Sequence, residues 1–468
     1  MASLAGMLQA VGHRVTGSDS AAYPPMSEQL AGWGIEVFPS YDAANLTPRP
    51  ELVVIGNAIS RGNPEVEFVL DERIPFTSMA ALLHDEFLRG RESLVVAGTH
   101  GKTTTTSMLA WIYQIASRQV AGWEPSFLIG GVAENFGTSF MVQPVSHGLA
   151  GPFIIEGDEY DTAFFDKGPK FMHYFPDAAI LTHVEFDHAD IYDDLRAVKT
   201  AFKRLVNLIP RRGRLVAFDG NENVTECVAK AFCAVERYGK EADSYWRMTD
   251  IAHEDGGVRW HLYRGGEFFA ALTLPMPGEH NALNATAAAA LAAGQGIPAA
   301  AIVAALATFR SVKRRLEVRA EVNGITIIDD FAHHPTAIRE TLRALRHAYP
   351  ERRLIAVLEP RSNTLRRNVF EEALVESLAL ADVVMLASVF KQESIPEGER
   401  LAPENVAVKL RQRGTPAEAL SDAAAIVAAL VPRLEAGDVV AIMSNGGFGD
   451  IYHLLPGAIA AQHVASLV

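Results

Sequence analysis

The stretch Val95–Thr104, which reads VVAGTHGKTT, carries the residue types that hold a phosphate chain. An apolar run leads into two glycines, and a helix-compatible segment follows over 105–116. Backbone N–H groups at such a strand–loop–helix turn bind phosphate oxygens. A turn with a solvated lysine is the alternative, and the buried strand, the glycines and Lys-Thr-Thr together disfavour it. The sequence therefore predicts a nucleoside-triphosphate site, made by Gly98, Thr99, His100, Gly101, Lys102, Thr103 and Thr104.

Two side chains of this loop have predicted chemical roles. Lys102 is expected to reach the terminal phosphates as a point charge and to act in catalysis, and the Thr103 hydroxyl is expected to bind Mg²⁺. The glycine spacing is tighter than in the usual phosphate loop, because only Thr99 and His100 separate Gly98 from Gly101. A nucleoside triphosphate and Mg²⁺ are the expected ligands of this loop.

Two further apolar runs end in acidic clusters. Phe153–Ile155 leads into Glu156-Gly157-Asp158-Glu159, and Ala178–Leu181 leads into the sequence THVEFDHAD over 182–190. Open α/β sheets bind ligands at the carboxyl ends of their strands, and carboxylates suit Mg²⁺. His188 is either a metal ligand or a general base, with a structural histidine as the alternative. We assign the metal to Thr103, Glu156 and His188, with Glu159 in reserve.

Polar residues elsewhere are weaker candidates. Asn281 and Asn284 precede and enter an alanine-rich helix, where they either read an adenine edge or cap the helix. Asp19 follows a short predicted strand, where an acidic side chain either binds a ligand or forms a turn.

Composition limits the class of protein. A chain of 468 residues is expected to form two or three domains. Its net charge of −14 argues against a nucleic-acid binder. The two cysteines, Cys227 and Cys233, have no metal-ligand spacing and suit a reducing compartment. No uncharged apolar run reaches the ~18 residues of a membrane span, so we expect a cytoplasmic protein without a membrane partner, as a monomer or weak dimer.

The first ninety residues alternate helices and strands in the manner of a Rossmann-like unit. We expect helices at 2–11 and 27–34 and strands at 13–16, 35–38 and 52–55. Such a unit begins with a strand and a glycine turn, and the sequence starts instead within its first helix. We therefore expect this region to lack one sheet strand and to bind its ligand weakly. The sequence leaves open whether Met1 is the native start.

The last third of the chain predicts a doubly wound sheet. Expected strands cover 325–330, 354–358, 383–387 and 439–443, and expected helices cover 337–347, 370–381, 404–413 and 422–435. A basic stretch, Phe309–Glu317, precedes them and reads as a hinge, with solvated linker charge as the alternative.

Four ordered motifs together resemble the Mur ligases, which are three-domain, ATP-dependent, amide-forming enzymes of peptidoglycan synthesis. The motifs are Gly98–Thr104, Glu156–Glu159, Val184–His188 and Gly278–Asn284. The resemblance implies an α/β fold with a Rossmann-like UDP-sugar domain at 1–90, a central P-loop ATPase domain at 91–308, and a doubly wound peptide-binding domain at 309–468.

The resemblance also implies further site residues. A hinge arginine, Arg314 or Arg315, is expected to approach the ATP phosphates, with Arg315 catalytic beside Lys102 and His188. Asp330 and His333, in the sequence DDFAHHP, are expected to contact ATP. The expected substrate-binding residues are Ser18, Asp19, Asn135, Gly137, His334, Arg361, Ser362, Asn363 and Thr364.

Three segments narrow the branch of the family. Glu359–Thr364, Ser444–Gly449 and Tyr23–Ser27 resemble the branch that acts in peptidoglycan recycling and joins L-alanyl-γ-D-glutamyl-meso-diaminopimelate to UDP-N-acetylmuramate. The alternative is the branch that adds free L-alanine. Two features depart from the family: the glycine turn near the UDP-sugar is absent, and His183 stands where Asn is usual.

Overall fold

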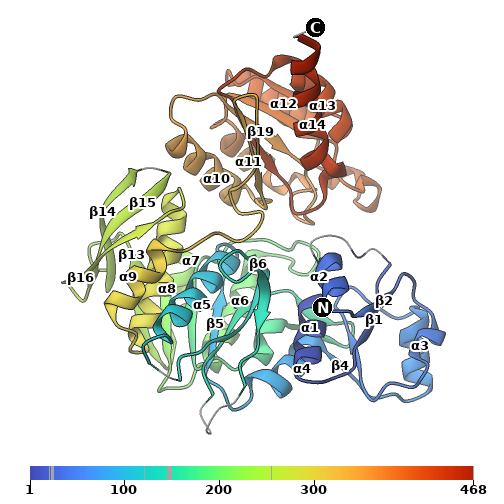
Figure 1. The fold of residues 1–468 in the computed structure, drawn as a ribbon, viewed down its shortest axis with the longest axis vertical. Helices are drawn as coiled ribbons and strands as arrows, with labels where there is room; N and C mark the ends of the chain where they lie inside the picture. The colour runs from blue at the N-terminus through green and yellow to red at the C-terminus, as the bar shows by residue number, and fades with distance from the viewer. Residues whose placement is uncertain (21, 23–25, 121, 145–149, 255, 467–468) are drawn as a thin grey trace.

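A computed structural model describes residues 1–20, 22, 26–120, 122–144, 150–254 and 256–466, with the side chains of 463–466 excepted. Figure 1 shows three regions: an N-terminal one in blue, a central one from cyan to yellow, and a C-terminal one in orange and red. The predicted α/β class is confirmed. Of the segment Tyr23–Ser27 that the sequence singled out, 23–25 lie outside the described residues.

The central region is built on a ten-stranded sheet in the order β16-β15-β14-β13-β12-β11-β5-β8-β6-β7. Its strands are β5 (Ser93–Ala97), β6 (Ser126–Ala133), β7 (Thr138–Met141), β8 (Phe153–Gly157), β11 (Ala178–Leu181), β12 (Arg214–Phe218), β13 (Ala234–Gly239), β14 (Trp246–Glu254), β15 (Gly257–Arg264) and β16 (Glu267–Leu274). A separate hairpin pairs β9 (Asp161–Ala163) with β10 (Asp166–Pro169).

Strand β5 lies between β8 and β11, and both pairings are parallel. The register sets Ala97 against Gly157 on one side and Leu181 on the other, so all three carboxyl ends meet at one edge of the sheet. All five residues of β5 are buried, because helices cover both faces. These helices are α5 (Lys102–Ala116), α6 (Leu195–Leu208), α7 (Glu222–Val228), α8 (Glu279–Gly294) and α9 (Ala299–Ala307).

The N-terminal region contains two separate parallel strand pairs, β1 with β2 and β3 with β4. No strand among the described residues joins the two pairs. The elements are α1 (Ala2–Ala10), β1 (Thr16–Ser18), α2 (Met26–Gly32), β2 (Glu36–Phe38), β3 (Val53–Ile55), α3 (Pro64–Asp71), β4 (Phe76–Ser78) and α4 (Met79–Leu83). The strand expected at 13–16 begins only at Thr16, because the His13 N–H still closes the end of α1 by donating to Leu8.

The C-terminal region has a six-stranded sheet in the order β17-β18-β22-β19-β20-β21. The strands are β17 (Glu317–Val322), β18 (Ile325–Asp330), β19 (Leu354–Leu358), β20 (Val383–Ala387), β21 (Ala417–Leu420) and β22 (Val439–Met443). The helices are α10 (Pro335–Ala348), α11 (Glu371–Leu378), α12 (Pro403–Gln412), α13 (Ala423–Leu430) and α14 (Ile451–Ser466).

Two predicted helix boundaries in this region are wrong for identifiable reasons. Helix α10 begins two residues early, since His334 caps it and Pro335 occupies its first turn. The helix expected over 422–435 ends as an α-helix at Leu430 and tightens into a 3₁₀ turn at Val431–Arg433, where Pro432 cannot donate a helix hydrogen bond. Among the described residues no helix is both long and apolar enough to span a membrane.

A candidate active site where the three regions meet

The phosphate loop is shaped by two glycines in left-handed conformations. Gly98 has φ +133°, and a Cβ there would collide with the Thr182 hydroxyl and the His183 backbone. Gly101 has φ +79°, and a Cβ there would meet the Asn284 side chain. Helix α5 begins directly afterwards at Lys102, so its first N–H groups face the loop. The local geometry is that of an anion site at a helix N-terminus.

Lys102 is buried and held by the acidic cluster after β8. Its Nζ donates to the Glu159 carboxylate at 2.7 Å and 3.0 Å and to the Gly98 carbonyl at 2.7 Å. His188 Nε2 lies 3.1 Å from the same carboxylate. Burial opposes the Glu159 charge, but Lys102 and His188 outweigh it and lower the pKa of Glu159 to about 2. The predicted residues Lys102, Glu159 and His188 are therefore brought together as one charged group.

Thr103 and Glu156 form a second contact beside this group. The Thr103 hydroxyl donates to Glu156 at 3.0 Å, and the Gly130 N–H donates to the other carboxylate oxygen at 2.9 Å. Burial raises the pKa of Glu156, although Lys102 works in the opposite direction. A buried carboxylate beside a hydroxyl, with two neutral donors as its hydrogen-bond partners, fits a hard divalent cation such as Mg²⁺.

The structure distinguishes the two hinge arginines. Arg314 donates to the carbonyls of Ser444 and Gly446, at 2.7 Å and 2.9 Å, and pairs with Asp329 at 3.2 Å. Its guanidinium therefore ties the hinge to the C-terminal region. Both arginines lie over the Phe331 ring, at 5.4 Å (Arg314) and 5.0 Å (Arg315) from its centroid, and both line the central cavity. Among the described residues the Arg315 guanidinium has no hydrogen-bond or ion-pair partner, so Arg315 is the hinge arginine available to a ligand.

Three predicted ATP contacts have structural partners within the protein, and their contact with ATP stays a prediction. The Asn281 amide donates to the Pro277 carbonyl at 2.8 Å, which is the capping alternative. Asn284 packs against Gly101 of the phosphate loop. Asp330 is buried and accepts from the Leu316 and Ala332 N–H groups and from the Thr341 hydroxyl. His333, by contrast, lines the cavity.

The predicted substrate residues of the central region lie apart from the cavity. The Asn135 amide donates to the Thr308 carbonyl at 3.1 Å and accepts from the Arg310 N–H at 2.6 Å, so it connects the β6–β7 turn to the end of α9. Gly137 has φ +68° in the same turn. Neither residue lines the cavity that holds Lys102.

The segment after β19 docks the C-terminal region onto the central one. Thr364 donates to Asp187 at 2.6 Å and accepts from the Ala189 N–H at 3.2 Å, and Asn363 donates to the Tyr160 hydroxyl at 2.9 Å. Ser362 stays within its own region by donating to the His333 carbonyl. Sequence reasoning missed this docking role, because nothing in the sequence shows which partner these side chains meet.

A small basic pocket of about 310 Å³ lies beside that docking contact. Its cations come from Arg361, Arg366 and Lys391. Two lining residues carry buried polar atoms that lack a hydrogen-bond partner within the described chain, a donor on Arg366 (Nε) and an acceptor on Asn445 (Oδ1). Arg361 also pairs with Glu359 at 3.5 Å, and Arg366 donates to Asn363 and Ser394. A pocket with three cations, a donor and an acceptor suits a ligand that carries carboxylates and an amine.

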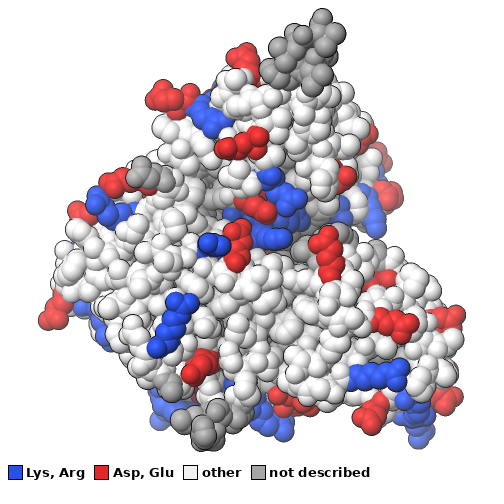
Figure 2. Space-filling view, in the orientation of Figure 1, with Lys and Arg blue, Asp and Glu red and all other residues white. Residues whose placement is uncertain are grey.

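A cavity of about 2550 Å³ runs from the N-terminal region, past the phosphate loop, to the C-terminal region. Ser18 and Asp19 line its N-terminal part, where Ser18 donates to Glu65 at 2.6 Å. Lys102, Arg315 and His333 line its middle. Figure 2 shows Lys and Arg side chains gathered where the C-terminal region meets the central one. Residues of all three regions line this one cavity, so ligands bound to different regions can meet inside it.

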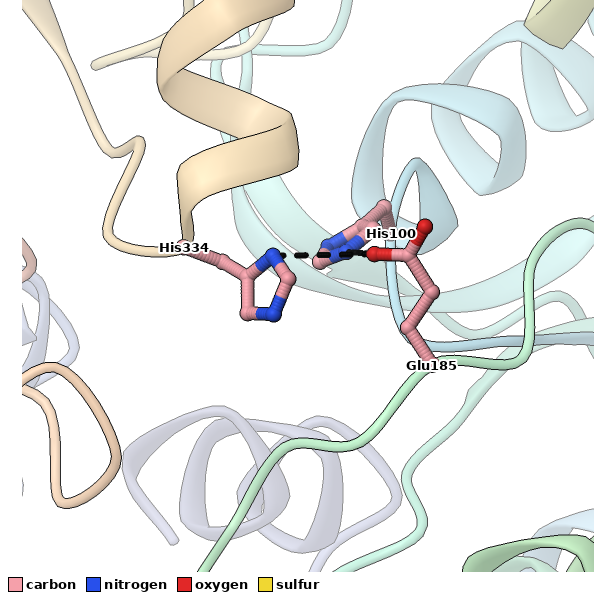
Figure 3. A group of neighbouring side chains, drawn as sticks. All are labelled: His100, Glu185 and His334. Carbon is pink, nitrogen blue, oxygen red and sulfur yellow. Dashed lines mark hydrogen bonds and ion pairs between the residues drawn. The ribbon is translucent and has the colours of Figure 1, made fainter. Parts of the chain in front are cut away.

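A histidine–carboxylate cluster lies at the phosphate loop, where His100 and His334 line the large cavity (Figure 3). His100 Nε2 lies 2.9 Å from Glu185 Oε2, and His334 Nδ1 lies 3.6 Å from the same oxygen. The Thr336 hydroxyl also donates to Glu185, at 2.8 Å. Burial raises the pKa of Glu185, but the hydrogen bond and charge of His100 outweigh burial and lower the pKa of Glu185 to about 2. This cluster was not predicted as a unit, since its members are far apart in sequence.

Comparison with protein families gives three matches in chain order. Residues 1–90 match the Mur ligase family catalytic domain, residues 96–292 match the Mur ligase middle domain, and residues 314–446 match the Mur ligase glutamate ligase domain.

Curated relatives match the chain over nearly its whole length. A UDP-N-acetylmuramate–L-alanyl-γ-D-glutamyl-meso-2,6-diaminoheptandioate ligase of Escherichia coli (strain K12) is 41% identical over 100% of this chain and 97% of its own. The enzyme of the same name from Haemophilus influenzae is 40% identical over 97% and 95%. A UDP-N-acetylmuramate–L-alanine ligase of Geotalea uraniireducens is 31% identical over 96% and 94%.

Solved structures agree with these relatives. A murein peptide ligase of Psychrobacter arcticus superposes with a TM-score of 0.73 at 36% identity, covering 98% of this chain and 96% of its own. An alanine ligase of Thermotoga maritima superposes with a TM-score of 0.77 at 22% identity, covering 100% and 97%, and that likeness concerns the fold alone.

Proposed function

The chain belongs to the Mur ligase family, and we propose that it joins L-alanyl-γ-D-glutamyl-meso-diaminopimelate to UDP-N-acetylmuramate at the expense of ATP. The observation that carries this proposal is the full-length identity of 40–41% to two ligases of that name, against 31% to an alanine ligase. The place of such a reaction is peptidoglycan recycling.

The chemistry requires activation of a carboxylate. Transfer of the γ-phosphoryl group of ATP to the muramate carboxylate gives an acyl phosphate and ADP, and attack by the peptide amine then expels phosphate and forms the amide. Lys102, the N-terminus of α5 and Arg315 are the groups proposed to stabilise the transferring phosphoryl charge. Closure of the regions excludes water while the acyl phosphate exists.

The metal site proposed for this reaction consists of Thr103, Glu156 and His188, with Glu159 in reserve. Mg²⁺ bound there would neutralise phosphate charge. In the structure Lys102 spans Gly98 and Glu159, so its ammonium is already held within the loop before a phosphate arrives. Glu159 fixes the position of His188, which acts in this proposal either as a metal ligand or as a general base.

The small basic pocket supports a peptide as the amine substrate. Free alanine has one carboxylate and is smaller than a pocket of about 310 Å³. The tripeptide carries several carboxylates and a distal amine, which match Arg361, Arg366, Lys391 and the Asn445 amide oxygen. Arg361 is preorganised, since its guanidinium lies 3.8 Å from the centroid of the Phe390 ring.

Ligation of free alanine is the second candidate function, because an alanine ligase is 31% identical over most of the chain. Beyond the family, a phosphotransferase would use the same loop but would need no third region. The boundaries 1–90, 91–308 and 309–468, a cytoplasmic location and a monomeric or weakly dimeric state remain part of this proposal.

Phosphate release tests the proposal directly. The enzyme, MgATP and UDP-N-acetylmuramate are combined with either the tripeptide or L-alanine, and released phosphate is followed over time. Phosphate release that depends on both UDP-N-acetylmuramate and the tripeptide supports the proposal. Release with alanine and none with the tripeptide assigns the second function, and release with neither amine contradicts ligation.

A further inference from the structure

His100, Glu185 and His334 form a cluster with the composition and spacing of a transition-metal site. His100 lies in the loop between β5 and α5, Glu185 follows β11, and His334 caps α10. Figure 3 shows the two imidazoles facing the Glu185 carboxylate from different regions of the molecule. One ligand atom from each residue lies within 4.8 Å of the other two.

Two of the separations between ligand atoms are close to those around a bound metal ion. Bonds of about 2.0–2.2 Å to Zn²⁺, arranged tetrahedrally or octahedrally, place neighbouring ligand atoms roughly 3.0–3.5 Å apart. The observed separations from Glu185 Oε2 are 2.9 Å to His100 and 3.6 Å to His334. The side chains are 16%, 25% and 6% exposed, so the ligand atoms are partly shielded while one side stays open to the cleft.

The ligand set also has the right chemistry. Two imidazoles and one carboxylate are the donors of several open zinc sites, and imidazoles discriminate against Mg²⁺. Thr336 donates to the Glu185 carboxylate and would orient it as an outer-shell partner. His334 Nδ1 accepts a long 3.3 Å hydrogen bond from the Thr336 N–H, which a metal would replace.

These residues are separate from the magnesium site proposed above. That site uses the different residues Thr103, Glu156 and His188. His100 and Glu185 belong to the central region, whereas His334 belongs to the C-terminal region, so an ion among them would connect the two.

We propose that His100, Glu185 and His334 form a second metal site, selective for Zn²⁺-class ions over Mg²⁺, that holds the central and C-terminal regions closed. The ion takes the place of the hydrogen bond between His100 and Glu185. Since the site exists only when the regions meet, metal binding favours the closed arrangement and slows the reopening that product release requires. Micromolar Zn²⁺ then inhibits turnover in the presence of excess Mg²⁺.

Cobalt titration of the nucleotide-free, full-length enzyme tests the site, because Co²⁺ substitutes for Zn²⁺ and absorbs visibly in a low-symmetry nitrogen–oxygen site. The variants are His334→Ala and the isosteric Glu185→Gln, with His261→Ala as matched control, since His261 forms an exposed pair with Asp250. Glu156→Gln weakens the separate magnesium site. Cys227 does not interfere, because burial raises its thiol pKa to about 11.

The expected result is a visible Co²⁺ spectrum in the wild type, Glu156→Gln and His261→Ala, and a loss of affinity of about tenfold or more in both His334→Ala and Glu185→Gln. Retention of the spectrum in Glu185→Gln and in folded His334→Ala would overturn the proposal. Loss in Glu156→Gln alone would place the ion in the magnesium site and also overturn it. Because ATP and substrates are absent, the outcome is independent of the proposed ligation.

Discussion

At the residue scale, the proposed ATP site centres on the charged group formed by Lys102, Glu159 and His188. Lys102 begins α5, whereas Glu159 and His188 follow the ends of β8 and β11. The three residues meet because β5 lies between β8 and β11. Lys102 donates to both oxygens of the Glu159 carboxylate, and His188 Nε2 lies 3.1 Å from one of them, Oε1. A buried charge pair of this kind contributes little net stability but fixes the position of its cation.

Replacing Lys102 with Met is expected to abolish ligation. The loss of one preorganised cation beside a transferring phosphoryl group costs about 3–4 kcal/mol, or roughly 10²–10³-fold in kcat. Steady-state phosphate release measures it. Because the substitution leaves Glu159 with His188 alone, Lys102→Met/Glu159→Gln is the folding control, and both proteins should show native circular dichroism. Near-normal turnover in Lys102→Met would refute the assignment of the ATP site.

Replacing Arg361 with Ala is expected to raise the apparent KM for the tripeptide by about 10–100-fold, the effect of one charge-assisted hydrogen bond. The KM for ATP should change much less, because Arg361 lines the small pocket proposed for the peptide and lies on the Phe390 ring, although it also borders the large cavity. Arg361→Lys retains charge and should recover part of the affinity. Equal increases for both substrates would assign Arg361 a structural role.

Some site residues could be read from the sequence and others could not. Gly98, Gly101 and Lys102 are contiguous, so their local backbone dictates their role. The roles of Arg314 and Arg315 could not be distinguished from the sequence, because only the structure shows that Arg314 donates to the carbonyls of Ser444 and Gly446. Two adjacent arginines can have different roles because their partners lie far away along the chain.

At the element scale, buried strands were predicted more reliably than their boundaries with loops. The strands β11, β18, β19, β20 and β22 were found where expected, because each is a short apolar run with nearly every residue buried. Strands β17 and β21 were missed, since both are less buried and mix polar with apolar residues. Both strands lie at the edges of the six-stranded sheet. A strand at an edge is only partly buried, so its sequence lacks the apolar run that marks a buried strand.

A histidine stack joins the central and C-terminal elements. His253 on β14 and His347 on α10 have ring centroids 4.1 Å apart and planes only 1° from parallel. Burial, assisted by the charge that His347 can carry, lowers the pKa of His253 from 6.5. Glu279 opposes this shift. Contact between β14 and α10 therefore favours neutral His253.

This contact should weaken in acid. Because the pKa of His253 is lower in the folded contact than its ordinary 6.5, the stabilisation is complete above that value and is lost as the pH falls below it. His253→Phe keeps a ring for the stack but cannot titrate. Small-angle scattering between about pH 8 and pH 5 should show that the radius of gyration rises less on acidification in His253→Phe than in the wild type. Identical curves would show that the His253–His347 contact does not control closure.

At the scale of the whole molecule, closure unites the site. The cavity of about 2550 Å³ collects residues from all three regions, and Thr364–Asp187 and Asn363–Tyr160 bonds connect two of them. The sequence could predict the regions but not their closed arrangement, since each docking partner lies far away along the chain.

Weakening this docking should slow catalysis without altering nucleotide contacts. Thr364→Val keeps the shape of the side chain but removes its hydrogen bond to the buried Asp187 carboxylate, at a cost of about 1.5–3 kcal/mol for a bond to a charged group. We expect a lower kcat and a more open enzyme by scattering. Ser377→Ala serves as a control, because Ser377 bonds only within the C-terminal region. An unchanged kcat in Thr364→Val would separate docking from turnover.

The central claim is that this Mur ligase uses a peptide as its amine substrate. The most direct measurement is a competition in one reaction, with UDP-N-acetylmuramate, MgATP and equal concentrations of the tripeptide and L-alanine, followed by mass spectrometry of the UDP-linked products. We expect UDP-N-acetylmuramoyl-tripeptide to accumulate in large excess over UDP-N-acetylmuramoyl-L-alanine. Predominant formation of UDP-N-acetylmuramoyl-L-alanine would contradict it.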